Sequence, residues 1–212
     1  MTISSIDETA ALVVIDLQKG IVIGPKAHPA EQIVANAARL AGAFRAQELP
    51  VALVNVAGGA PGRTDFDYGD DDEEDAENDE NDEDEVDAGP AVWTEPVPEL
   101  GAQPSDLRVT KLCWGAFTGS SLHATLQGLG VTQIVLAGIN TQIGVETTAR
   151  SAYELGYHVV LATDAMTSGD AEAHENTVHR IFPRLGEVGT TNDVLNLLLS
   201  RRASRPEAVT AE

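Results

Sequence analysis

Two residues with ionisable side chains stand where apolar stretches of the chain end. Asp16 follows the apolar run 11–15, and Lys111 closes the stretch 107–111. Packing alone gives little reason for a carboxylate at the end of a buried strand, whereas ionisable groups in unusual environments are typical of functional sites. We therefore treat Asp16 and Lys111 as candidates for proton transfer and for binding a charged substrate. A purely structural pairing of the two side chains, or a turn capped by Asp16, is the alternative.

A third candidate is the turn 139–144, which follows another apolar run. In an open parallel sheet, ligands bind beyond the carboxyl ends of the strands, at the point where the strand order reverses. Asp16, Lys111 and this turn all fall at the carboxyl ends of expected strands. The pattern thus predicts one site built from segments that are far apart in the sequence.

The elements that position these residues alternate between strands and helices. Continuous apolar runs predict strands buried on both faces, and apolar residues at helical spacing predict the helices between them. Such alternation is typical of an α/β domain with a parallel sheet and helices on both faces. The predicted strands are 11–16, 51–56, 107–111, 133–139, 158–164 and a short one around 188, and the predicted helices begin near 29, 121, 140, 170 and 191.

The stretch between about residues 58 and 103 interrupts this alternation. It holds sixteen Asp or Glu between Asp65 and Asp87, with no Lys or Arg among them. So acidic a segment cannot bury apolar surface, and it lacks the Asp-x-Asp-x-Asp-Gly pattern of a calcium loop. We predict a single domain over residues 1–202 with a flexible acidic insertion at about 65–87, followed by a tail at 203–212.

Composition and charge exclude several classes of function. The net charge of the 212 residues is −21, but outside the acidic insertion 18 acidic residues face 13 basic ones, a net of −5. Negative charge opposes binding to nucleic acids and to anionic membranes, so neither is an expected partner. The single cysteine excludes an internal disulfide framework, and no apolar run is long enough to span a membrane. Because no secretory signal is visible, we expect a cytoplasmic protein.

Three motifs resemble those of the isochorismatase-like superfamily, also called cysteine hydrolases. They are residues 14–18 (VIDLQ), 111–119 (KLCWGAFTG) and 137–150 (AGINTQIGVETTAR), and the resemblance covers about residues 10–200 apart from the acidic insertion. It implies a three-layer α/β/α sandwich around a six-stranded parallel sheet with Rossmann-like topology. It also implies a non-proline cis peptide near Ile139–Asn140 and a homo-oligomer, either a dimer or a tetramer.

Most members of this superfamily use an Asp–Lys–Cys triad, and the resemblance assigns its first two members to Asp16 and Lys111. At the cysteine position this chain has Gly144, which offers no nucleophile, so a thioester cannot form there. The isochorismatase branch likewise lacks that cysteine, and in it an aspartic acid protonates the vinyl ether of isochorismate before water captures the cation. By resemblance, Asp16 would supply the proton and Lys111 would hold the carboxyl group. The expected function is hydrolysis of a small molecule by acid–base catalysis.

Residues near these motifs are expected to form the walls of the substrate pocket. The candidates are Gln18, Trp93, Trp114 and Phe117, together with the turn residues Ile139, Asn140 and Thr141. Trp114 and Phe117 could equally belong to the core.

No metal site and no cofactor are expected. Nicotinamidases of the superfamily carry an Asp-x-His pair and a further His after the second strand, but residues 57–106 contain no histidine. His174 and His179 are five residues apart, not the four that a helical metal site prefers, so surface or packing roles are expected for them. No phosphate-binding glycine motif is present, and the expected partner is a small-molecule substrate.

Two alternatives to an acid–base hydrolase stay open. The chain could be a pseudoenzyme that binds a small molecule or a protein without turnover, or an amidohydrolase with a different nucleophile. Cys113 is the candidate for that nucleophile, because it would share a face with Lys111 if the strand continued. A lone cysteine is, however, more often a small buried hydrophobe.

Overall fold

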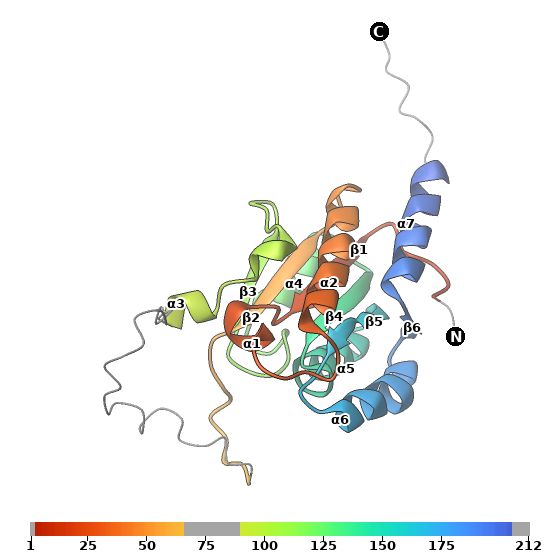
Figure 1. Ribbon diagram of the computed structural model, residues 1–212. Helices are drawn as coiled ribbons and strands as arrows, with labels where there is room; N and C mark the ends of the chain where they lie inside the picture. Colours follow the sequence, from red (N-terminus) through yellow and green to blue (C-terminus); the bar gives the residue numbers. More distant parts are fainter. Residues whose placement is uncertain (1–2, 66–89, 205–212) are drawn as a thin grey trace.

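A six-stranded parallel sheet forms the centre of the computed structural model, which describes residues 3–65 and 90–204 (Figure 1). The strands lie in the order β3-β2-β1-β4-β5-β6, which is the order of Rossmann-like sheets and confirms the fold predicted from the sequence. Their bounds are β1 Ala10–Ile15, β2 Val51–Val56, β3 Leu107–Lys111, β4 Gln133–Ile139, β5 His158–Thr167 and β6 Glu187–Gly189.

The strand order reverses between β1 and β4, and this reversal brings the candidate residues together. β1 pairs with β2 on one side and with β4 on the other, with Ile15 opposite Gly138. β3 lies beyond β2 and ends at Lys111. Because all strands run in parallel, Asp16 after β1, Lys111 of β3 and the turn after β4 lie at the same edge of the sheet.

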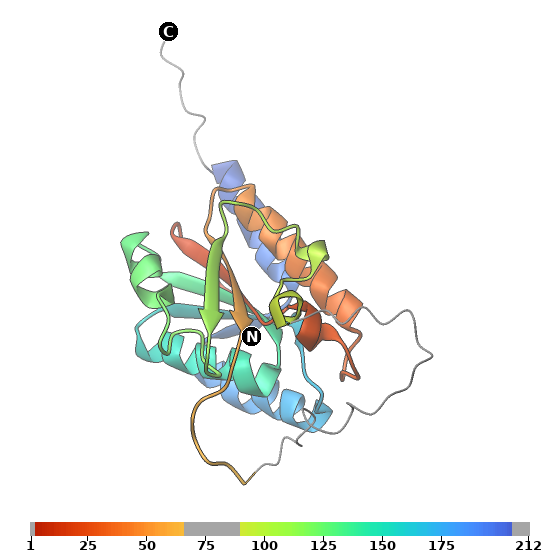
Figure 2. The ribbon, with the colours of Figure 1, turned by 90° about the vertical axis from the view of Figure 1, so that its left-hand side faces the viewer.

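Helices cover both faces of the sheet and complete the three layers (Figure 2). In one layer, α2 and α7 pack against each other and against β5. In the other, α4 and α5 contribute buried side chains to the opposite core. The helical elements are α1 Lys19–Val22, α2 Ala30–Arg45, α3 Pro90–Trp93, η1 Pro98–Leu100, α4 Leu122–Gly128, η2 Thr141–Val145, α5 Glu146–Glu154, α6 Ala171–Asn176, η3 Thr177–Ile181, η4 Phe182–Arg184 and α7 Thr191–Ser204.

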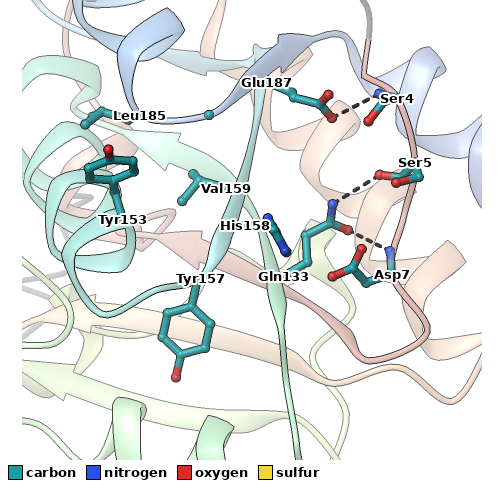
Figure 3. A pocket seen from close by; sticks show the side chains of 11 residues that line it. Ser4, Ser5, Asp7, Gln133, Tyr153, Tyr157, His158, Val159, Leu185 and Glu187 are labelled. Carbon is teal, nitrogen blue, oxygen red and sulfur yellow. Dashed lines mark hydrogen bonds between the residues drawn. The ribbon is translucent and has the colours of Figure 1, made fainter.

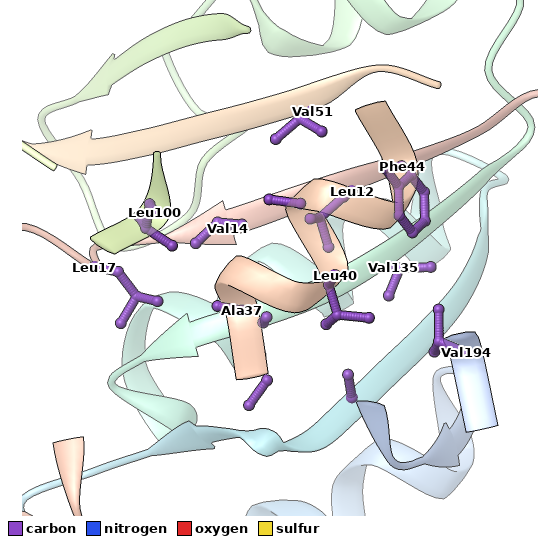
Figure 4. Close-up of a cluster of buried hydrophobic side chains, with 14 of the residues drawn as sticks. Leu12, Val14, Leu17, Ala37, Leu40, Phe44, Val51, Leu100, Val135 and Val194 are labelled. Carbon is purple, nitrogen blue, oxygen red and sulfur yellow. The ribbon is translucent and has the colours of Figure 1, made fainter. Parts of the chain in front are cut away.

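The alternation of side chains along β1 explains why its sequence is apolar throughout. Leu12 and Val14 belong to the core beneath α2, where Phe44 is fully buried (Figure 4). Val13 and Ile15 point to the opposite face and belong to the other core. Since both faces of this strand exclude water, a charged residue can follow only where the strand ends.

β5 is longer than the sequence predicts. The expected strand ends at residue 164, whereas the observed one continues to Thr167. The extension pairs Met166 with Gly138 after a register shift in the β4 ladder. Pairing with a neighbour therefore prolongs the strand, and the sequence of β5 alone does not contain that information.

The helix predicted from residue 170 to residue 182 is divided in the structure. It begins as predicted, since the Asp170 side chain accepts a hydrogen bond from the Ala173 amide and caps α6. It then widens into the π-helical turn η3 and tightens into the 3-10 turn η4 at Pro183. Proline lacks the amide hydrogen that would continue an α-helix, so the element ends here.

Some predictions fall on residues outside the described part of the chain. The acidic insertion at about 65–87 lies there almost entirely, as does the predicted tail apart from residues 203 and 204, which belong to α7. Within residues 3–65 and 90–204, no helix has both the length and the apolar character needed to cross a membrane. The homo-oligomer and the compartment stay predictions.

Replacing Gly138 with alanine is expected to destabilise the fold. A Cβ at this position would lie 2.0 Å from the carbonyl oxygen of Ile15, and its φ of 131° disfavours any side chain. Crowding and backbone strain together are expected to lower the free energy of unfolding by at least about 2 kcal/mol. Urea unfolding measures this change.

Gly42→Ala is the matched control. Gly42 is exposed within α2, and a Cβ there would meet nothing within 4 Å. This substitution is expected to raise the free energy of unfolding by about 0.5–1 kcal/mol through helix propensity. Equal effects at positions 42 and 138 would contradict the close packing of β4 against β1.

Candidate active site

A buried ion pair joins the carboxyl ends of β1 and β3. Lys111 Nζ lies 2.7 Å from Asp16 Oδ2, and the two side chains are 2% and 7% exposed. The same ammonium donates a hydrogen bond to the main-chain oxygen of Cys113 at 3.2 Å. Asp16 has a φ of 51°, in the left-handed region that aspartate enters more readily than most residues. The chain therefore leaves the sheet at Asp16, and the carboxylate remains at the edge.

Burial makes the Asp16 carboxyl a weak acid. The loss of solvation raises its pKa to about 6 and outweighs the opposing effect of the Lys111 charge. Oδ2 contacts the ammonium, whereas Oδ1 is buried and receives no hydrogen bond from the described residues. A carboxyl group with a pKa near neutrality and one oxygen without a protein partner can both donate and accept a proton.

Gly144 faces this carboxylate from the turn after β4. The Ile139–Asn140 peptide bond is cis, as the sequence resemblance implies, and the π-helical turn η2 follows it. A Cβ at position 144 would lie 3.2 Å from Asp16 Oδ2 and 3.0 Å from Ile15 Cγ2. The Thr148 hydroxyl donates to the Gly144 carbonyl oxygen at 2.6 Å. Position 144 therefore belongs to the site, although glycine brings no functional group to it.

A cavity of about 360 Å³ opens beside these residues. Among the described residues that line it, the ion pair carries charge, Asn140 carries an amide, and most of the others are apolar or glycine. A cavity of this kind suits a small molecule with an apolar body that is oriented by a few polar groups. The lining consists of Asp16, Ile21, Val56, Gly58, Gly59, Lys111, Trp114, Ile139, Asn140, Ile143 and Gly144.

A second cavity of about 370 Å³ lies at the amino ends of β4 and β5 (Figure 3). Its polar groups largely satisfy one another. Gln133 Oε1 accepts a hydrogen bond from the Asp7 amide, and Gln133 Nε2 donates to the Ser5 carbonyl oxygen. Because the described residues around this cavity form no buried ion pair and lie away from the carboxyl ends of the strands, we assign the chemistry to the cavity beside Asp16.

The sequence predicts Gln18 and Trp93 in the pocket wall, but neither is among the described residues that line the cavity. Both instead contact the segments next to it. The buried Gln18 amide binds Val56 in both directions: Nε2 donates to its carbonyl oxygen at 3.0 Å, and Oε1 accepts from its amide at 2.8 Å. The Trp93 indole packs on Gly20 of α1, where a Cβ would lie 2.0 Å from the ring. The two side chains thus hold α1 and α3 against the end of β2.

Phe117 and Thr141 also lie outside the described lining of the cavity. The Phe117 ring stacks on Tyr157, with 5.9 Å between the centroids. Thr141 is fully buried, and its hydroxyl donates to the Thr167 carbonyl oxygen at 3.0 Å. The predicted wall residues that the structure does bring to the cavity are Trp114, Ile139 and Asn140.

Four lining residues were not among the sequence candidates, whereas Ile143 belongs to the candidate turn 139–144. Val56, Gly58 and Gly59 end or follow β2, so the switch-point argument applied to that strand would have indicated them. Ile21 reaches the cavity from the short helix α1, where an apolar residue gives no such signal.

Cys113 is not among the described lining residues either. β3 ends at Lys111, so the alternation of a continuing strand does not extend to Cys113. Its main-chain oxygen, not its thiol, contacts the ion pair. The structure therefore offers no support for a relocated thiol nucleophile.

The structure is that of an α/β protein with a buried ion pair and a cavity at the switch point of its parallel sheet. The chain belongs to the isochorismatase family, because the family model described as the isochorismatase domain matches residues 10–193. It is 41% identical to YecD of Escherichia coli O157:H7 over 200 residues, which cover 90% of this chain and 97% of YecD. It is 43% identical to YwoC of Bacillus subtilis over 188 residues, which cover 89% of this chain and 93% of YwoC. Both relatives are named as uncharacterized isochorismatase family proteins.

A solved structure and a shorter match extend the comparison. The structure of an isochorismatase family protein from Burkholderia thailandensis has a TM-score of 0.80 and 39% identity, covering 93% of this chain and 100% of that one. The ureidoacrylate amidohydrolase RutB of Variovorax paradoxus is 34% identical over 100 residues, which cover 47% of this chain and 40% of RutB. The chain is thus an isochorismatase family hydrolase, and the matching proteins with named activities carry different ones, since nicotinamidase 3 of Arabidopsis thaliana is also 36% identical over 73 residues, which cover 34% of this chain and 37% of that protein.

Removing one member of the buried ion pair is expected to cost more stability than removing both. Asp16→Asn leaves the Lys111 ammonium buried without an opposite charge, so a loss of about 3–5 kcal/mol is expected. Lys111→Met has a similar cost at pH 8 but a smaller one at pH 5, where the isolated carboxyl takes up a proton. The double variant recovers most of the loss because no charge stays buried. Urea unfolding of the three variants measures these differences.

Arg150→Met serves as the control for this cycle. It removes an ion pair with Glu146 on α5 in which the arginine side chain is 51% exposed. Exposed pairs of this kind contribute about 0.5 kcal/mol, so the change should be small. Losses that simply add in the Asp16→Asn/Lys111→Met double variant would contradict a direct interaction between the two buried charges.

Proposed function

We propose that the chain hydrolyses a small molecule by acid–base catalysis at Asp16, without a covalent thioester. The observation that carries the proposal is Gly144, whose Cβ position lies 3.2 Å from the Asp16 carboxylate and bears no nucleophile. In the cysteine hydrolases that the chain resembles, the attacking cysteine occupies this position. We therefore place the chain in the branch with glycine there, in which water has to be the attacking group.

Asp16 suits proton transfer because its pKa lies near the pH at which enzymes commonly operate. Burial raises this pKa to about 6, so the carboxyl can lose and regain a proton without a large energetic penalty. Lys111 binds Oδ2 at 2.7 Å and stabilises the carboxylate that remains after the proton has left. Oδ1, which has no partner among the described residues, is the oxygen that would face the substrate.

The more specific proposal is vinyl ether hydrolysis of isochorismate. Protonated Asp16 transfers its proton from Oδ1 to the terminal methylene carbon of the enolpyruvyl group, which becomes an oxocarbenium ion. Water adds to the cationic carbon and returns a proton to the carboxylate, giving a hemiketal. The hemiketal hydroxyl then loses its proton while the bond from the hemiketal carbon to the ether oxygen breaks, and this oxygen, which stays on the carbocycle, takes up a proton. Pyruvate and a dihydroxybenzoate-type diol are released. The proton balance closes on Asp16, and the protein needs no nucleophile.

Amide hydrolysis is the second candidate, and the similarity to the ureidoacrylate amidohydrolase RutB favours it. In this reaction, ionised Asp16 would take a proton from the water that attacks the carbonyl carbon and would then donate it to the leaving nitrogen. The two reactions thus begin from opposite protonation states of the same carboxyl group.

The wild-type protein is expected to release pyruvate from isochorismate, and Asp16→Asn is expected to lose this activity. General acid catalysis contributes about 10²–10⁴-fold, so the rate should fall at least about 10²-fold. Cys113→Ser should retain the activity, because the thiol does not line the described cavity and the main-chain oxygen that binds Lys111 is kept. Pyruvate is measured by coupling to lactate dehydrogenase, and circular dichroism verifies that the variants fold.

If the folded wild-type protein releases no pyruvate, isochorismate is not the substrate. A panel of small carboxamides and ureido acids then tests the second candidate. Absence of turnover on both classes would favour a binding protein that keeps the pocket without catalysis.

The pH dependence of kcat/KM, which reports the pKa values of the free enzyme, is expected to separate the two reactions. Because the pKa of Asp16 is raised to about 6, the carboxyl is mostly protonated below that pH and mostly ionised above it. Vinyl ether hydrolysis begins from the acid, so its rate should fall about tenfold per pH unit above this pKa. Amide hydrolysis begins from the carboxylate, so its rate should rise towards this pKa and then level off. A rate that does not vary across this pKa would contradict both roles of Asp16.

A further inference from the structure

Histidine and glutamate side chains gather where the loop before α2 meets α6, outside the lining of the active-site cavity (α6 is labelled in Figure 1). A ring nitrogen of His28, a ring nitrogen of His174 and a carboxylate oxygen of Glu175 lie within 4.8 Å of one another. The two rings are 4.7 Å apart between their centroids. We propose that these three side chains bind a divalent transition metal ion, with Zn²⁺ as the ion that fits them best.

Hydrogen bonds prepare His174 as a ligand. The Thr141 hydroxyl donates its proton to the Thr167 carbonyl oxygen at 3.0 Å. In the 2.8 Å contact between Thr141 Oγ1 and His174 Nδ1, the donor is therefore the Nδ1–H group. Nε2 then carries the lone pair that a metal ion requires.

The His28 ring contacts the hydroxyl group of a second threonine, Thr167, in a similar way. Thr167 Oγ1 accepts a hydrogen bond from the main-chain amide of His28 at 3.1 Å, and it lies 3.2 Å from Nδ1 of the His28 ring. A hydroxyl oxygen has two lone pairs, so it can accept Nδ1–H as well and leave Nε2 to the ion. Histidines that bind metals ordinarily donate their other N–H to an oxygen in this way.

Glu175 completes the ligand set from the surface. Its Oε2 lies 2.8 Å from His179 Nε2, which leaves the other carboxylate oxygen for the ion. Ligand atoms at about 2.0–2.1 Å from a tetrahedral Zn²⁺ lie about 3.3 Å apart. Atoms within 4.8 Å of one another reach that spacing by rotation of the exposed Glu175 side chain and a small shift of the half-buried His28.

The chemistry of the ligands selects the class of metal. Imidazole nitrogen favours zinc, copper and nickel, whereas magnesium and calcium prefer sites made of oxygen alone. Two imidazole nitrogens and one carboxylate oxygen form a three-ligand zinc set whose fourth position is open to water or to an anion.

The ion would join segments that the chain brings from three places. His28 precedes α2, His174 belongs to α6, and Thr141, which holds the His174 ring, begins the turn after β4. Thr141 directly follows Asn140, which lines the active-site cavity. Metal binding should therefore stabilise the structure around the active site, and it does so whatever reaction that site performs.

Calorimetric titration of the metal-free full chain with Zn²⁺ tests the proposal. We expect one site with at least about tenfold weaker binding in His28→Ala and in Glu175→Gln, since even the outer partners of a bound metal contribute about 10–100-fold to affinity. Neither residue is buried, so both variants should fold. His158→Ala removes an exposed histidine at the start of β5 and should bind like the wild type.

The acidic insertion offers many carboxylates, so a second readout has to distinguish the two kinds of site. Nitrogen-15 NMR of the histidine side chains does this. Zn²⁺ on Nε2 should fix His28 and His174 in the Nδ1–H form and shift their Nε2 resonances, whereas binding by carboxylates alone leaves both rings unchanged. Unchanged histidine spectra, equal affinity in wild type and the two ligand variants, or no Zn²⁺ binding at all would each overturn the proposal.

Discussion

The electrostatic attraction between the buried side chains of Asp16 and Lys111 is the constraint on which the rest of the structure depends. Removing two charges from water is costly, and their attraction offsets the cost only when the geometry is held closely. β3 lies two strands away from β1, a separation of about 9–10 Å, so only a side chain as long as lysine can reach across the end of β2. The strand order of the sheet therefore explains why residue 111 has a side chain as long as that of lysine.

The loss of solvation that makes burial of the ion pair energetically unfavourable also raises the pKa of Asp16 to about 6, where a carboxyl group can exchange protons. A carboxylate whose purpose was structural would use both of its oxygens, whereas Oδ1 of Asp16 has no donor among the described residues. The neighbouring Gly144 adds no group of its own but lets other atoms approach the carboxyl. Asp16 thus forms a strong ion pair through Oδ2 while Oδ1 has no hydrogen-bond partner among the described residues. This combination favours a catalytic role for the carboxyl group over a purely structural one.

Strands and strand ends could be predicted from the sequence because burial on both faces leaves a continuous apolar run and a charge at its end. Proximity to a motif predicted the pocket residues less well. In a segment without regular secondary structure, the position of a residue in the sequence does not determine where its side chain points. Phe117 follows β3 but turns to Tyr157, and Gln18 follows Asp16 but binds the main chain of Val56. The cluster around His28 depends on tertiary contacts between distant segments, for which no local pattern exists.

The residues that follow β1 also determine where the long excursion between β2 and β3 begins and ends. Residues 17–19 form main-chain hydrogen bonds with residues 95–97, while Gln18 binds Val56, the last residue of β2. The two ends of the excursion are thus fastened by the same short segment, independently of what lies between them. Because closing a loop costs only about 0.6 kcal/mol for each doubling of its length, related chains can lengthen, shorten or rewrite this stretch with little effect on stability. Evolution can therefore vary the amino acids of this stretch beside a fixed buried carboxyl group without changing the fold that holds that group.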